Sequence, residues 1–218
     1  MLYIEKSIEP IELVNAKRNG LKSYYELTSD TKTVIKKALL QEQGYLCAYC
    51  MKRIDLQNTT IEHYIPQNPL GIEADDMLSI DYNNMLAVCC GNVNHRKSEL
   101  TCDKHRGNTP LTVDPRNKHS VEKICYKYDG TVYSEDKEID KDLNQTLNLN
   151  CEAVLLKQNR KSVLDAVKKE ILKKSAGNEV SKRQLINMLD KLKTKNDGQY
   201  KPFCGIAIWY LRKKLARY

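Results

Sequence analysis

Clustered cysteines and an adjacent acid–histidine pair are the residues of this 218-residue chain whose types and spacing could do chemistry. Cys47 and Cys50 form a Cys-x-x-Cys pair, and three more cysteines follow within 56 residues of the first. Two thiolates at this spacing fit a zinc knuckle, because the turn between them directs both sulfurs at one tetrahedral ion. We therefore expect a structural zinc site with the ligands Cys47, Cys50, Cys89 and Cys102, and with Cys90 and His95 as the alternatives.

Two other interpretations of these cysteines are possible. A Cys-x-x-Cys pair can be a redox centre, but no thioredoxin-like β-α-β pattern surrounds it, and isolated cysteines are often small buried hydrophobic residues. Residues 45–107 are rich in Cys, Asn, Gly and His. A structural zinc ion can supply on the order of 10 kcal/mol of folding free energy, so zinc explains how such a segment could fold.

The expected location of the protein supports metal binding over disulfide formation. The first 20 residues carry charges throughout and lack the apolar segment of a signal peptide. No run approaches the roughly 18 apolar residues of a membrane span. We therefore expect a cytoplasmic protein without a membrane partner, where clustered cysteines bind metal more often than they form disulfides.

A second group of chemically active residues lies around the cysteine pairs. Glu62 and His63 follow a β-prone run, and Asp103 and His105 come just after Cys102. In a regular strand Glu62 and His63 would face opposite sides. A bend in the chain is therefore needed for both to serve one site.

The order of these motifs resembles the zinc-containing HNH endonucleases. The chain has Cys-x-x-Cys, Glu-His-x-x-Pro, Asn-Met-Leu-x-x-Cys and Cys-Asp-x-x-Arg-Gly. The usual family form is Cys-x-x-Cys, Asp-His-x-x-Pro, Asn-Leu-x-x-x-Cys and Cys-Asn-x-x-Lys-Gly. The widely spaced second cysteine pair and the segments 111–115, 123–134 and 146–150 resemble, more narrowly, the PtuB-like nucleases of Septu and Septu-type retron antiphage systems.

The resemblance implies a metal-dependent endonuclease that hydrolyses phosphodiester bonds of DNA or RNA. Such a reaction needs a base for water and a cation for the developing negative charge. The expected catalytic residues are His63 as the base, Asn84 as the residue that orients it, and Glu62. The expected ligands of a catalytic Mg²⁺ or Mn²⁺ are Glu62 and Asp103, with His105 as an alternative, because both ions prefer hard oxygen ligands.

Two features depart from the family pattern. Asp103 stands where the family has Asn or His, which makes the ligand set more acidic. Twelve residues separate Cys89 from Cys102, where the family has two. This insertion contains polar residues that could contact substrate or metal, namely Asn92, Asn94, His95 and Arg96.

The expected elements give an α+β fold. Residues 31–43 predict a helix capped by Thr31 and ended by Gly44, and residues 45–107 predict loops and short strands. Two β-prone runs around Asp129-Gly130 predict a hairpin over 123–134. Helices are expected after a cap at Asn150, over about 181–193 and over about 203–217. We expect a zinc-clamped ββα-metal nuclease domain over 1–148 and a helical subdomain over 149–218.

The C-terminal part of the chain is the most basic. The whole chain has a net charge of +8, whereas residues 151–218 hold 17 Lys and Arg against 6 Asp and Glu. A basic face can bind phosphates, although charge runs are often only a solvated surface. An apolar stripe could instead dock on a partner protein. It is densest at Phe203, Ile206, Ile208, Trp209 and Leu211.

The resemblance also implies partners. It implies a PtuA-like ABC-type ATPase and, in retron systems, a reverse transcriptase with its RNA–DNA hybrid. The chain contains no P-loop, so we do not expect it to be the ATPase. The candidate contacts to a partner or to nucleic acid are Trp209, Arg212 and Lys213.

A non-catalytic function competes with this hypothesis. A zinc-knuckle module could recruit nucleic acid without cutting it. Glu62 and His63 argue against such a module, because binding alone needs neither a base nor a carboxylate beside the phosphates. A redox role for Cys47 and Cys50 would require reactive thiols, which tight zinc binding would exclude.

Overall fold

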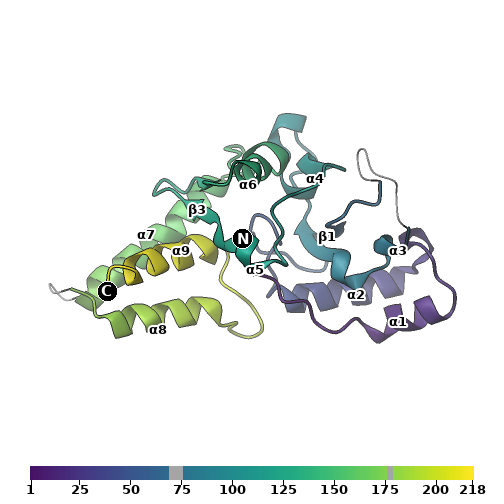
Figure 1. Cartoon of the computed structure of the whole chain (residues 1–218), viewed down its shortest axis with the longest axis horizontal. Coiled ribbons are helices and arrows are strands. Elements are labelled where there is room, and N and C mark those ends of the chain that lie inside the picture. Colours follow the sequence, from purple (N-terminus) through teal and green to yellow (C-terminus); the bar gives the residue numbers. More distant parts are fainter. Residues whose placement is uncertain (69–75, 176–178) are drawn as a thin grey trace.

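The computed structural model describes residues 1–68, 76–175 and 179–218. In these residues, helices accompany two small antiparallel sheets of two strands each. Figure 1 shows α1 and α2 at one end of the molecule and α7, α8 and α9 at the other. The mixed helix-and-strand fold predicted from the sequence is confirmed.

The first sheet lies between two helices. Strand β1 (Thr59–His63) runs antiparallel to β2 (Met85–Cys89), with His63 opposite Met85. Helix α2 (Ser29–Glu42) contacts both strands, and α4 (Cys102–Arg106) contacts β2. All five residues of β2 are buried, since the sheet is covered. This explains why β2 is a continuous apolar run without the alternation of a half-exposed strand.

The N-cap of α2 is Thr28, three residues before the predicted Thr31, so this prediction was wrong. Thr28 has the extended backbone that an N-cap requires, and its hydroxyl accepts a hydrogen bond from the Thr31 amide at 3.2 Å. Thr31 is therefore the donor and lies inside the helix. Gly44 follows the helix with a φ of +58°, in agreement with its predicted role as the terminator.

Short elements connect the larger ones. Helix α1 (Ile11–Arg18) and the 3-10 helix η1 (Tyr24–Glu26) precede α2. Between β1 and β2 lie α3 (Asp76–Ser79) and η2 (Tyr82–Asn84), and η3 (Lys97–Glu99) lies between β2 and α4. The described part of 45–107 therefore contains the predicted loops and short strands, together with short helices that the prediction did not include.

The predicted hairpin is the second sheet. After α5 (Lys118–Glu122), β3 (Ile124–Tyr126) pairs with β4 (Val132–Ser134). The turn between them contains Gly130, whose φ is +91°. Glycine adopts this conformation at little steric cost. Helix α6 (Lys137–Lys141) and the π-helix η4 (Asp142–Thr146) follow.

Asn150 does not cap the following helix, so this prediction was wrong. Helix α7 (Leu156–Ser175) begins six residues later. The Asn150 side chain instead extends the edge of β4, because its Oδ1 accepts from the Val132 amide at 3.0 Å and its Nδ2 donates to the Val132 carbonyl at 2.8 Å. The Arg160 guanidinium of α7 donates to the same Oδ1 at 2.7 Å and to the Leu149 carbonyl at 2.9 Å. The hairpin and α7 are therefore joined by side-chain hydrogen bonds.

The last two helices match their predicted ranges. Helix α8 (Lys182–Lys193) begins with a capping box of Ser181 and Gln184, and α9 (Cys204–Leu215) packs against both α7 and α8. The buried apolar residues form one cluster that runs from the N-terminal segment to α9. The division at residue 148 stays a prediction. Among the described helices, none combines the length and the apolar character of a membrane span.

The close approach of the hairpin turn to α7 gives a test of this packing. A Cβ atom at Gly130 would lie 2.1 Å from the Lys157 carbonyl oxygen, whereas Gly20 has nearly the same φ of +92° and nothing within 4 Å. We expect Gly20→Ala to lower the free energy of unfolding by about 1 kcal/mol through backbone strain. Gly130→Ala should lower the free energy of unfolding by about 2 kcal/mol more, because its methyl group would also collide with the Lys157 carbonyl. Urea unfolding of both variants checks this, and equal losses would contradict the packing.

Candidate active site and metal centre

Four buried cysteines form a metal-binding cluster. The sulfur atoms of Cys47, Cys50, Cys89 and Cys102 all lie within 4.8 Å of one another. The Cys47–Cys102, Cys50–Cys89 and Cys89–Cys102 sulfur separations are 3.9, 3.8 and 3.7 Å. Zn–S bonds of about 2.3 Å in a tetrahedron place the sulfurs about 3.8 Å apart, whereas a disulfide would bring two of them to about 2.05 Å. The distances and the all-sulfur donor set both suggest zinc binding.

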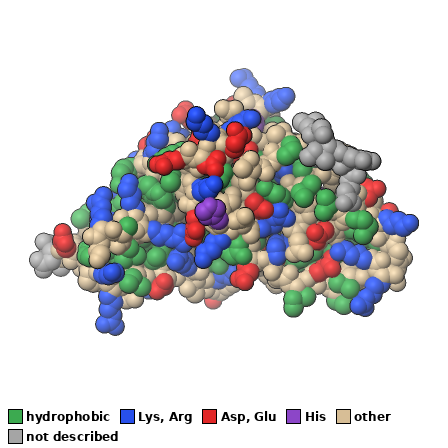
Figure 2. Space-filling view, in the orientation of Figure 1, with side chains coloured by type: hydrophobic (Ala, Val, Ile, Leu, Met, Phe, Trp, Pro, Cys, Tyr) green, Lys and Arg blue, Asp and Glu red, His purple; other side chains and the backbone are tan. Residues whose placement is uncertain are grey.

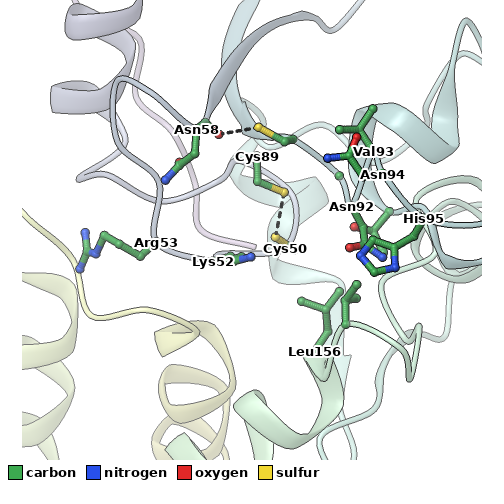
Figure 3. A pocket seen from close by; sticks show the side chains of 14 residues that line it. Cys50, Lys52, Arg53, Asn58, Cys89, Asn92, Val93, Asn94, His95 and Leu156 are labelled. Atoms are coloured by element: carbon green, nitrogen blue, oxygen red, sulfur yellow. Dashed lines mark hydrogen bonds between the residues drawn. The ribbon is translucent and has the colours of Figure 1, made fainter.

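Three separate parts of the chain deliver these sulfurs. Cys47 and Cys50 lie in a tight turn closed by the Met51 amide, which donates to the Cys47 carbonyl at 3.1 Å. Cys89 is the last residue of β2, and Cys102 is the first residue of α4. Figure 3 shows the sulfurs of Cys50 and Cys89 directed at each other. The cluster therefore fixes the end of β2 relative to the start of α4.

The two alternative ligands lie outside this cluster. The Cys90 thiol is partly exposed and donates to the Asn58 carbonyl at 3.2 Å. His95 is exposed, and its Nδ1 lies 3.4 Å from a Glu99 carboxylate oxygen. Asn92, Val93, Asn94 and His95 line a pocket beside the cysteines, as Figure 3 shows. The long insertion thus forms one wall next to the metal centre.

His63 is the last residue of β1 and is held by one defined hydrogen bond. Its Nε2 lies 2.8 Å from the Ser79 carbonyl oxygen at the end of α3. A carbonyl only accepts, so this contact places the proton on Nε2 and leaves the Nδ1 lone pair available. The Tyr24 ring meets the imidazole edge-on, with the ring centroids 4.9 Å apart. Burial lowers the pKa of His63, which favours the neutral imidazole.

Glu62 lies in a buried polar network with Tyr49 and Arg106. Its Oε1 accepts a hydrogen bond from the Tyr49 hydroxyl at 3.1 Å and forms an ion pair with Arg106. Burial raises the pKa of Glu62 to about 8, and the neighbouring Asp103 carboxyl group adds to this effect, against the opposing effect of Arg106. Two adjacent carboxyl groups at a buried site are a suitable oxygen donor set for Mg²⁺ or Mn²⁺. A divalent cation there would stabilise both in the charged form.

Arg106 is a central residue that the motif analysis did not assign to a role. Its side chain is fully buried, and besides Glu62 it donates to the carbonyl oxygens of Thr109 at 2.8 Å, His63 at 3.2 Å and Tyr64 at 2.5 Å. One guanidinium therefore holds both the carboxylate and the backbone at the end of β1. The sequence feature that could have revealed this role is the position of Arg106 in the Cys-Asp-x-x-Arg-Gly motif. It lies three residues after Asp103 and therefore on the same face of α4.

The remaining candidate site residues contact backbone groups. Asn84 accepts from the Ile65 amide at 2.7 Å and donates to the Ile65 and Leu78 carbonyls at 3.0 Å each. It therefore joins the segment that follows β1 to α3, whose Ser79 carbonyl contacts His63, without a described contact of its own to the imidazole. The Nδ1 of His105 lies 2.9 Å from the Thr146 carbonyl oxygen, so this ring is directed toward η4.

The candidate partner residues lie on α9. Trp209 is half-buried, and Arg212 and Lys213 are exposed. The rest of the predicted apolar stripe is not available for docking, because its other four members are buried in the core, namely Phe203, Ile206, Ile208 and Leu211.

Comparisons with known proteins found distant relatives of the chain. No family model matches it. The chain is similar to two proteins whose names place them among the HNH endonucleases. These distant homologues support an HNH endonuclease family.

The first of these relatives is the "Retron Ec83 putative HNH endonuclease" of Escherichia coli. It is 26% identical over 194 residues, which cover 69% of this chain and 75% of the relative. The second is the "Retron Vc95 putative HNH endonuclease" of Vibrio cholerae serotype O1 biovar El Tor. It is 24% identical over 101 residues, which are 46% of this chain and 47% of the relative. The second match thus spans about half of each protein.

Neighbouring cysteines at the end of β2 test the metal centre. Cys89 belongs to the cluster and Cys90 does not. We expect Cys89→Ser to lose most of the bound zinc and to unfold at a clearly lower temperature, because the structural metal contributes directly to folding. Cys90→Ser should retain about one zinc per chain. Metal analysis by mass spectrometry with thermal unfolding checks both, and equal zinc contents would contradict this ligand set.

The Arg106–Glu62 pair can be tested by its contribution to stability. Arg106→Gln should lower the free energy of unfolding by about 3 kcal/mol or more, because a buried carboxyl group loses its cation. Adding Glu62→Gln should recover part of this loss, since the buried carboxyl group that has lost its partner is then replaced by an amide. Urea unfolding in zinc-containing, magnesium-free buffer measures both.

The matched control is Lys174→Gln, which removes an exposed ion pair with Glu170. This change should leave stability almost unaltered, because exposed pairs contribute little. A small loss in Arg106→Gln, similar to this control, would show that the pair is not structurally important.

Proposed function

We propose that this protein is a metal-dependent HNH endonuclease that hydrolyses phosphodiester bonds of nucleic acid. In this proposal β1, β2 and α4 are the ββα core, and the cysteine cluster clamps it. The observation that carries the proposal is the convergence of Glu62 and His63 at the end of β1 with Asp103 on α4, directly beside four buried cysteines.

His63 acts as the general base through Nδ1. The hydrogen bond to the Ser79 carbonyl fixes the ring orientation and keeps the proton on Nε2, which is the arrangement that leaves Nδ1 free to accept a proton from water. Asn84 is a positioning residue, because it joins Ile65, two residues after His63, to Leu78, which precedes the Ser79 that contacts the imidazole.

In this proposal Glu62 and Asp103 would hold a catalytic Mg²⁺ or Mn²⁺. When bound, the ion polarises the phosphate and stabilises the leaving oxygen. Arg106 keeps the Glu62 carboxyl group in place, and its bonds to the His63 and Tyr64 carbonyls align the end of the strand. The base and the two carboxylates therefore depend on one rigid framework.

The biological setting follows from the relatives and the motif resemblance. Both relatives carry retron names, and the PtuB-like motif order is typical of antiphage defence. We infer that the chain is a toxic effector in a Septu or retron system in the cytoplasm. It would act with a PtuA-like ABC ATPase and, in a retron, with a reverse transcriptase and its RNA–DNA hybrid.

Cleavage assays with one histidine removed test this function. Wild-type protein and His63→Ala, each co-expressed with the ATPase, are incubated with duplex DNA, single-stranded DNA or tRNA in Mg²⁺ or Mn²⁺. We expect cleavage by the wild type and a loss of about 10²- to 10⁴-fold in the variant, with zinc retained, because a general base contributes about that much.

The matched control is His119→Ala, since His119 is exposed and lies outside the site. It should cleave like the wild type. Equal cleavage by wild type and His63→Ala would remove His63 from the mechanism. Binding without cleavage by any form would favour a zinc-knuckle module that recruits nucleic acid.

A further inference from the structure

A groove of about 700 Å³ is lined by none of the residues of β1 and β2. It is formed by α9, the β3–β4 hairpin, α5 and the N-terminal segment. Figure 1 shows these four segments together near the N-terminus. It shares no lining residue with the group formed by Glu62, His63 and Asp103. The groove is lined in part by the three candidate contact residues of α9, Trp209, Arg212 and Lys213.

The groove is rich in aromatic rings. Tyr126 and Tyr133 from the hairpin, Tyr3 from the N-terminal segment and Trp209 from α9 line it. Trp209 is the single tryptophan of the chain. Tyr126 and Tyr128 both meet its ring edge-on, with centroid distances of 6.1 Å. Such contacts hold the half-buried indole in a fixed orientation while part of it stays accessible.

Basic side chains surround these rings. Lys118, Lys193, Arg212 and Lys213 line the groove and are exposed. Within the described part of the chain, no ion pair joins any of these four to a carboxylate. The acidic residues on the lining are Glu122 and Glu135, so positive charge prevails. Figure 2 shows Lys and Arg side chains over the part of the molecule that holds α7, α8 and α9.

The aromatic and basic groups are interleaved. The Nζ atom of Lys213 lies 5.3 Å from the centre of the Trp209 ring. Beyond the rim, Tyr128 is half exposed, and the Lys168 Nζ atom lies 4.6 Å from its ring centre. Rings that can stack on bases, with cations that can meet phosphates, form the arrangement by which proteins bind single strands without sequence preference. Duplexes hide the faces of their bases, so the aromatic rings would contribute nothing to duplex binding.

A protein partner fits this groove less well. The apolar residues of α9 are already packed inside the fold, and the unpaired cations would have to be desolvated by an apolar partner. A single-stranded nucleic acid fits the groove better, because its phosphates can pair with the cations and its bases can stack on the rings.

The geometry points to the α9–hairpin groove as a binding site for single-stranded nucleic acid, with Trp209 as the stacking platform and Arg212 and Lys213 as phosphate contacts. This inference rests on the proposed function in one respect, since it names a single-stranded tract of the nuclease substrate as the ligand. The groove would hold that tract away from the cleavage site.

Binding of a fluorescent 20-nucleotide oligothymidylate tests the inference without any cleavage step. The full chain with zinc and the His63→Ala change is titrated by anisotropy and by quenching of the single tryptophan. We expect quenching on binding. Trp209→Ala should weaken binding about tenfold, because one base–aromatic stack contributes about this much, whereas Trp209→Phe should keep most of the affinity. Duplex DNA should compete poorly.

A charge variant covers the case in which Trp209→Ala unfolds the protein. Lys213→Gln should weaken binding and reduce the slope of log affinity against log salt by about 0.7, the value for one phosphate contact with a single strand. Lys37→Gln is the matched control, because Lys37 is an exposed lysine of α2 outside the groove. It should leave the slope unchanged.

The outcomes separate this inference from the nuclease proposal. Cleavage by the wild type, with oligothymidylate binding unaffected by Trp209→Ala and Lys213→Gln, would overturn the groove alone. Binding that depends on both residues, in a protein that cuts nothing, would support the groove and overturn the nuclease. Loss of a co-purifying protein in Trp209→Ala, with oligothymidylate binding intact, would make the groove a protein-docking surface and overturn the inference.

Discussion

Four sulfur atoms less than 5 Å apart are the constraint on which the geometry of the candidate site depends. They join a turn after α2, the end of β2 and the start of α4, three segments that are far apart in the sequence. Because Cys102 and Asp103 are consecutive, the cluster also fixes where the Asp103 carboxyl group lies relative to β1. The position of the candidate catalytic carboxylate of Asp103 therefore depends on the cysteine cluster.

Arg106 provides the second constraint, at the other end of the short helix α4. The helix is only five residues long, so its own hydrogen bonds cannot define its position. The cysteine cluster holds its first residue, and the buried guanidinium holds its last residue against Glu62 and the end of β1. The helix is therefore oriented by side-chain contacts at both ends, and tyrosine hydroxyl groups, such as that of Tyr49, complete the polar network.

Sequence reasoning succeeds where a short motif determines the structure. The Asp129-Gly130 turn, the apolar spacing of α8 and the Cys-x-x-Cys pair each act over a few residues, and all three appear in the fold as expected. It fails where a side chain bonds to a distant segment. Asn150 looks like a helix cap, yet its amide matches the backbone groups of Val132, 18 residues earlier. The role of Arg106 depends on Glu62, 44 residues before it, and no local pattern reports such a pairing. The assignment of Glu62, His63 and Asp103 to one site came from a family resemblance, because spacing alone does not bring their segments together.

The loop between Cys89 and Cys102 has a consequence for how such a protein can change during evolution. Both of its ends are anchored to the same cluster, so its length can vary without moving β2 or α4. Doubling a loop costs only about 0.6 kcal/mol of closure entropy. One residue inserted between Cys102 and Asp103, by contrast, would turn the carboxylate about 100° around the helix axis. Changes in length are therefore tolerated in the loop before Cys102 but not between Cys102 and Asp103. The loop can acquire new contacts beside the metal centre while the candidate catalytic residues keep their positions.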